Sequence, residues 1–217
     1  MINLIFIVVG LIQLGIAMTG TRYTRKYFTS YAVMILGVVY GLTYDNLAIS
    51  AGAFLGEGEF TKALSWPRYA IHALFTPTMI ISAFGILRLA GVKWAQSRTW
   101  HTVICVIATA LIFYGIYVDI LNLNLVPQHQ MGVLRYVNDF HLIPGPPLPA
   151  ITTIFFLLIF GIVLWRHTKW PWLFVGSLFM FITAGVMGVP FIANIGEIGI
   201  AGGMVTSMIR VRMSNNA

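Results

Sequence analysis

Residues 28–55 read FTSYAVMILGVVYGLTYDNLAISAGAFL, and this stretch decides the class of fold. It is long enough to cross a bilayer, which requires about 20 predominantly apolar residues in a helix. Asp45 is its one charged residue, and Tyr44 and Asn46 stand beside it. A carboxylate inside a membrane span is costly, so by default it marks a functional site.

The composition of the whole chain agrees with a polytopic membrane protein. The chain is 59% hydrophobic and 9% charged, whereas soluble domains have about 25% charged residues. The net charge of +7 does not indicate nucleic-acid binding, because the basic residues lie at the ends of apolar runs. The single cysteine, Cys105, has no partner for an intrachain disulfide.

We predict an all-α fold in which residues 1–217 form a single domain of seven transmembrane helices. The first apolar run is read as a helix and not as a cleaved signal, because its basic cluster follows it. The last two spans are separated at Gly188-Val189-Pro190, which is expected to be a tight turn or a break in one helix. The predicted spans are 2–19, 29–54, 67–90, 101–122, 148–166, 171–188 and 190–209.

The basic residues predict the orientation in a plasma membrane or another cellular membrane. Alternate connections and the C-terminal tail contain most of the 13 lysines and arginines. Such residues favour the cytoplasmic side, so we expect the N-terminus outside and the C-terminus in the cytoplasm. Residues on the predicted cytoplasmic side are Arg22, Arg25, Lys26, Arg88, Lys93, Arg98, Arg166, Lys169, Arg210 and Arg212.

The longest predicted outer connection covers residues 123–147. Residues 132–141 are expected to form an amphipathic turn or a short helix lying on the membrane. A connection of this length in a small protein is often a lid or a binding loop, although it can also simply cross the top of the bundle.

Four predicted spans place an ionisable residue in one layer, in the outer third of the membrane. Asp45 and Asp119 each lie 17 residues from the inner end of their span, which is about 25 Å at ~1.5 Å per residue. His72 and Glu197 fall at about the same height. Charges in a membrane are expected to face inward and to pair, so we expect a polar cavity that opens to the outside.

Amides and other polar side chains accompany these acids. Asn122 follows Asp119 by three residues and Asn194 precedes Glu197 by three, so each pair shares a helix face. We predict Asp45 and Asp119 as the catalytic pair, with Glu197 as a third acid. The predicted substrate-binding residues are Tyr44, Asn46, Arg68, His72, Tyr117, Asn122 and Asn194.

The leading functional hypothesis is an integral membrane enzyme that performs acid–base chemistry on a lipid-soluble substrate, such as an isoprenoid-like compound. An apolar pocket favours the protonated form of one carboxyl group, whereas a second one paired with Arg68 or His72 stays ionised. Two such acids can protonate one end of a substrate and deprotonate the other. Isomerisation, cyclisation and hydrolysis all fit this arrangement.

Three other interpretations remain open. The acids can form the relay of a proton- or cation-coupled transporter. The chain can be an accessory or cofactor-binding subunit of a membrane complex. The polar residues can also be purely structural and hold helices together. Small membrane-embedded terpene cyclases, sugar facilitators and seven-helix receptors have similar outlines, but this similarity concerns architecture alone.

Several cofactor and partner classes receive no support from the sequence. HExxH, HxxxH and CxxC are missing, so we predict no dedicated metal site, although two histidines and three acids can still meet in space. A retinal Schiff base is excluded, because each lysine lies at the end of a predicted span. We expect no cofactor and no nucleic-acid partner; the expected partners are membrane lipids and the substrate.

Overall fold

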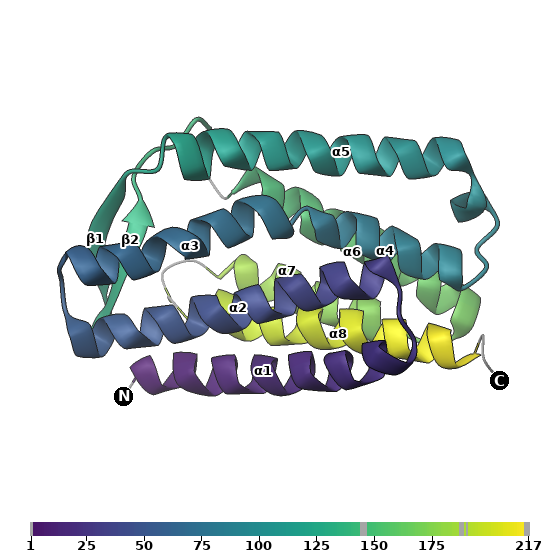
Figure 1. Cartoon of the computed structure of the whole chain (residues 1–217), viewed down its shortest axis with the longest axis horizontal. Coiled ribbons are helices and arrows are strands. Elements are labelled where there is room, and N and C mark those ends of the chain that lie inside the picture. The colour runs from purple at the N-terminus through teal and green to yellow at the C-terminus, as the bar shows by residue number, and fades with distance from the viewer. Residues whose placement is uncertain (1, 144–146, 187–188, 190, 215–217) are drawn as a thin grey trace.

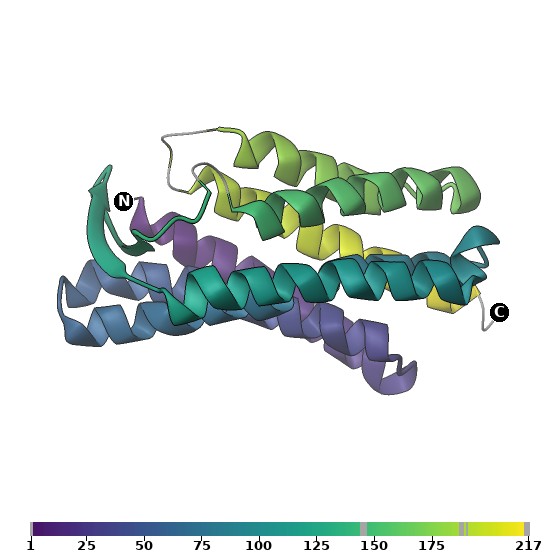
Figure 2. The ribbon, with the colours of Figure 1, turned by 90° about the horizontal axis from the view of Figure 1, so that it is seen from above.

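The computed structural model describes residues 2–143, 147–186, 189 and 191–214. Its helices run side by side along the long axis of the molecule (Figure 1). One end, where α1 begins, is covered by a β-hairpin, and we call it the hairpin end (Figures 1 and 2). The elements are α1 (Asn3–Lys26), α2 (Ser30–Leu55), α3 (Glu59–Phe75), α4 (Thr78–Leu89), η1 (Trp94–Gln96), α5 (Arg98–Ile116), η2 (Tyr117–Leu121), β1 (Leu125–Gln130), β2 (Val133–Asn138), α6 (Leu148–Thr168), α7 (Trp172–Ala184) and α8 (Ile192–Ser214).

Local signals explain where α2 begins and ends. The hydroxyl oxygen of Thr29 caps its N-terminus by accepting a hydrogen bond from the Ala32 N–H at 3.0 Å. Gly56 follows the helix with φ of 72°, a left-handed conformation that glycine adopts without steric cost. The helix therefore covers almost the same residues as the span predicted at 29–54.

The third predicted span is two helices with a bend between them. The axes of α3 and α4 differ by 41° across a short break. Pro77 lies in this break and has no N–H to donate to the preceding turn, so the helix cannot continue through it unchanged. The helix also begins earlier than expected, at Glu59.

The structure supports a helical membrane protein with fewer confirmed spans than predicted. In the described part of the chain, five helices are long and apolar enough to cross a membrane, and the bent α3–α4 pair raises this to six. The remaining predicted span, 171–188, corresponds to α7, which has 13 residues and is shorter than the ~20 that a bilayer core requires. The predicted boundary at Gly188-Val189-Pro190 lies largely outside the described residues, since only Val189 is described.

The prediction of an amphipathic turn or a short helix at 132–141 was wrong. Residues 125–130 and 133–138 form an antiparallel hairpin in which Gln130 pairs with Val133. The two residues of its turn, Met131 and Gly132, have φ of 52° and 77°. Two consecutive positive φ angles give a turn whose twist matches that of paired strands, which favours a hairpin over a helix.

The main apolar core and the buried charged residues occupy different halves of the bundle. Most of α4 is buried, including Ile80, Phe84 and Leu87, and it packs among α2, α5, α6 and α8. This core lies toward the end opposite the hairpin, which we call the basic end because it contains the ten basic residues named above. The buried ionisable side chains lie instead in the hairpin half of the bundle.

Helices α7 and α8 approach each other through glycines. A side chain at Gly176 of α7 would collide with the backbone carbonyl of Gly199 in α8. A Cβ at Gly203 would lie 2.6 Å from the carbonyl oxygen of Trp172. Gly199 and Gly203 of α8 thus lie at points where the backbones of the two helices touch. Small residues allow such close contact between helices in membranes.

Gly176→Ala is expected to destabilise the protein, because the added methyl group forces two helix backbones apart. Overpacking of this kind costs about 1–3 kcal/mol. Gly15→Ala is the matched control: a Cβ there meets nothing within 4 Å, and alanine is the better helix former by up to about 1 kcal/mol. Thermal unfolding in detergent should give opposite signs for the two variants, and equal midpoints would contradict the role of the glycine contact.

Candidate functional site

The centre of the candidate site is a buried ion pair between α2 and α3. The Arg68 Nε–H donates to Asp45 Oδ1 at 2.7 Å, and the two side chains are 6% and 3% exposed. Removing two charges from water is costly, so a buried pair persists only when its geometry and its further hydrogen bonds are good. Asp45 has such support, because the Asn194 amide of α8 donates to its Oδ2 at 3.4 Å.

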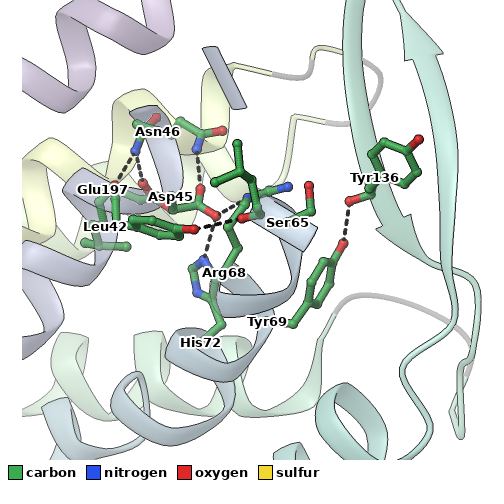
Figure 3. A network of polar contacts seen from close by, with 12 residues as sticks. Leu42, Asp45, Asn46, Ser65, Arg68, Tyr69, His72, Tyr136 and Glu197 are labelled. Carbon is green, nitrogen blue, oxygen red and sulfur yellow. Dashed lines mark hydrogen bonds and ion pairs between the residues drawn. The ribbon is translucent and has the colours of Figure 1, made fainter. Parts of the chain in front are cut away.

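His72 is the accessible member of this group. Its Nε2 lies 3.6 Å from Asp45 Oδ1, yet its side chain is 39% exposed. Its Nδ1 lies 3.4 Å from the Thr76 hydroxyl, one turn further along α3. Figure 3 shows the imidazole pointing from α3 toward Asp45. His72 is therefore the most exposed of the side chains that contact the two buried carboxyl groups.

Glu197 has different surroundings from Asp45. Its Oε2 accepts hydrogen bonds from the amide groups of Asn46 at 3.0 Å and Gln13 at 3.2 Å. Asn46 and Gln13 are both fully buried, and Glu197 is 8% exposed. The two acids thus meet in one cluster, one beside a guanidinium and the other beside two neutral amides (Figure 3).

Helices α2 and α8 contribute matched pairs of an acid and an amide. Asp45 of α2 bonds Asn194 of α8, and Asn46 of α2 bonds Glu197 of α8. Asn194 and Glu197 lie three residues apart and so share one face of α8. This reciprocal arrangement explains why YDN stands in the middle of an apolar span: each polar residue has its partner across the helix interface.

The local structure of α3 positions Arg68 and His72. Pro67 lies inside this helix, where it cannot donate a hydrogen bond to the preceding turn. The hydroxyl of Tyr44 donates to the carbonyl of Leu64 in that turn at 2.9 Å. This hydrogen bond of Tyr44 therefore connects α2 to α3 next to the ion pair.

The hairpin packs against α3 next to the cluster. The Tyr69 hydroxyl of α3 donates to the Tyr136 carbonyl at 3.1 Å and accepts from the Asn138 N–H at 3.0 Å. Burial, together with the nearby charge of Arg68, lowers the pKa of Arg135 on β2, whereas Asp45 acts in the opposite direction. Arg135 thus lies within the electrostatic field of the cluster.

Three predicted site residues lie apart from the bonded cluster. Asp119 of η2 accepts from the Asn138 amide at 3.3 Å, so its hydrogen bond connects it to the hairpin. The Asn122 amide donates to the Tyr117 carbonyl at 2.8 Å, and Tyr117 is 47% exposed. The structure brings together the other seven predicted residues: Tyr44, Asp45, Asn46, Arg68, His72, Asn194 and Glu197.

Sequence analysis missed two members of this region. Gln13 is the only amide between Asn3 and the end of the first apolar run, and this isolation was a usable signal. Arg135 carried no comparable signal, because the loop that contains it was expected to lie flat on the membrane. The pairing of β2 with β1 is what turns Arg135 toward the bundle.

Asp45, His72 and Glu197 are the residues that could hold a metal ion. Each offers one ligand atom, and these atoms lie within 4.8 Å of one another. Arg68 already binds Asp45 Oδ1, so a cation at this point would compete with the guanidinium for the same oxygen. Among the described residues, a metal ion bound at this set would therefore have to displace Arg68 from Asp45 Oδ1.

No family model matches this chain, and no curated protein or solved structure matches it.

Proposed function

We propose that this protein is an integral membrane enzyme that isomerises or cyclises a lipid-soluble substrate by proton transfer. One observation carries the proposal: two buried carboxyl groups with different surroundings meet beside a half-accessible histidine. Pairs of titratable groups whose environments differ are the arrangement from which acid and base roles arise. The substrate would approach along the His72 ring.

In this mechanism Glu197 donates and His72 accepts. The Glu197 carboxyl group gives its proton to a double bond or carbonyl of the substrate, and His72 removes a proton from a neighbouring carbon. The imidazolium exchanges its protons with solvent, because the ring is 39% exposed, and it then returns a proton to Glu197, whose oxygen lies within 4.8 Å of the ring nitrogen. No co-reactant is consumed, which favours isomerisation or cyclisation over hydrolysis.

Asp45 and Arg68 would keep this pair in position. The Asp45 carboxylate stabilises a protonated His72, and Arg68 keeps Asp45 ionised. Gln13 and Asn46 orient the Glu197 carboxyl group through their hydrogen bonds. Their contribution is positional, since both are fully buried behind the acid.

The proposal is tested by the transfer of solvent deuterium to carbon. Membranes that contain the protein are incubated in D2O, and their lipid extracts are compared by mass spectrometry with extracts of membranes that lack it. Acid–base catalysis should produce a compound heavier by about 1 Da than its unlabelled form, because the donated proton comes from exchangeable groups. Identical labelling patterns in the two membranes would contradict the enzymatic function.

A proton-coupled transporter is the second candidate, and the bend of 41° between α3 and α4 favours it. Interrupted helices commonly form the binding sites of transporters, and His72 lies one turn before this break. A transporter would leave membrane lipids unlabelled in D2O. It would instead acidify or alkalinise the interior of vesicles when its solute is added.

We further propose seven spans, with α7 as a short sixth span, the N-terminus outside and the C-terminus in the cytoplasm. The ten basic residues at one end of the bundle support this orientation. A cysteine replacing Gly58, in a Cys105→Ala background, should react with an impermeant thiol reagent added to intact cells. A cysteine replacing Ser97 should react only after lysis, and reversed labelling would invert the proposed topology.

A further inference from the structure

A second candidate site lies at the basic end of the bundle, away from the carboxylates. A cavity of about 220 Å³ opens where α4, α6 and α8 end. The residues that line it are Ala90, His167, Thr168, Arg210, Val211 and Ser214. It is smaller than the ~300 Å³ at which sites for drug-sized ligands begin, so it suits a small polar group.

Most of the small polar groups around this cavity already have hydrogen-bond acceptors within the protein. The Thr168 hydroxyl donates to the Leu164 carbonyl at 2.8 Å, and the Ser214 hydroxyl donates to the Arg210 carbonyl at 3.2 Å. His167 Nε2 donates to the Ala90 carbonyl at 3.0 Å. The Thr168, Ser214 and His167 donors are therefore already used within the protein. The guanidinium of Arg210 is the main donor that remains to bind a ligand.

An aromatic ring, and not a carboxylate, orients the Arg210 guanidinium. Its guanidinium lies over the indole ring of Trp170, with its carbon 5.8 Å from the ring centroid, a contact that favours a fixed orientation. Among the described residues no ion pair includes Arg210. The chain's six acidic residues all belong to the hairpin half or to the connections at the hairpin end. The guanidinium of Arg210 therefore has no acidic partner among the described residues.

We propose that this cavity binds the phosphate group of an anionic phospholipid. A planar guanidinium matches the oxygens of a phosphate in a two-pronged hydrogen bond. A lipid, and not a soluble phosphate, is the occupant, because Trp165, Trp170 and Trp172 lie at this end, on α6, on α7 and on the connection between them. Tryptophans gather at the level of lipid headgroups.

The test uses the purified full-length protein in neutral detergent and native mass spectrometry. The probes are dioctanoyl phosphatidylglycerol, dioctanoyl phosphatidylcholine and glycerol 3-phosphate. Phosphatidylglycerol should bind at least about fivefold more tightly than the other two, since it combines a net negative charge with acyl chains. Equal binding of phosphatidylcholine would overturn the proposal, and equal binding of glycerol 3-phosphate would overturn the lipid as the occupant.

Two variants locate the binding. Arg210→Gln should weaken phosphatidylglycerol binding by about tenfold, because a charge-assisted hydrogen bond is lost. Lys93→Gln removes a charge from the same end but outside the cavity, and it should change the affinity less than about twofold. Equal losses in both variants would show diffuse attraction to the basic end and would overturn the assignment of the cavity.

Discussion

Glu197→Gln should reduce the incorporation of deuterium into lipid by about 100-fold or more, because it removes the proton that the proposed mechanism transfers. Glutamine keeps the size of the side chain and can still accept hydrogen bonds from Gln13 and Asn46. Folding should therefore survive. The readouts are the initial rate of labelling in membranes and the thermal midpoint of the purified protein in detergent.

Two further variants make this result specific. Glu59→Gln changes an exposed acid in the first turn of α3 and should leave the labelling rate unchanged. Asp119→Asn tests whether Asp119 takes part in the chemistry, as the Asp45–Asp119 pair predicted from the sequence requires. Full activity in Glu197→Gln together with inactivity in Asp119→Asn would show that the predicted pair carries the chemistry.

Arg68→Met should cause the largest loss of stability, about 3–5 kcal/mol, because it leaves the Asp45 carboxylate buried without its counter-charge. Methionine retains most of the apolar bulk of arginine but none of its charge. The protein should unfold at a markedly lower temperature in detergent, and its yield in membranes should fall. Arg166→Met, which changes an exposed arginine at the end of α6, is the matched control and should have little effect.

A double variant keeps this prediction testable if Arg68→Met alone does not fold. Asp45→Asn leaves the buried guanidinium unpaired, so it should also destabilise the protein. The combination of Asp45→Asn with Arg68→Met removes both charges and should recover much of the lost stability. Additive losses in the double variant would mean that the two side chains do not act as a pair.

Much of the candidate site was predictable from the sequence because membrane depth limits where charges can lie. Counting residues along each span placed Asp45, His72 and Glu197 in one layer, and the structure joins these three residues. The same count also placed Asp119 in that layer. Its hydrogen bond nevertheless connects it to Asn138 of the hairpin, because height along a helix does not specify the direction in which a side chain points.

The sequence by itself determined that this is a helical membrane protein, where most helices lie, and that Asp45 and Glu197 are buried. These properties follow from apolar length and from the cost of charge in lipid, which act on each segment separately. Only the tertiary structure decided that Glu197 and not Asp119 joins Asp45, that Gln13 completes the cluster, and that a hairpin packs next to it. Those outcomes depend on the rotation of each helix about its axis and on strand pairing between distant residues. They are set by close packing, as at Gly176 and Gly199, where the backbones of α7 and α8 come too close together to admit a larger side chain.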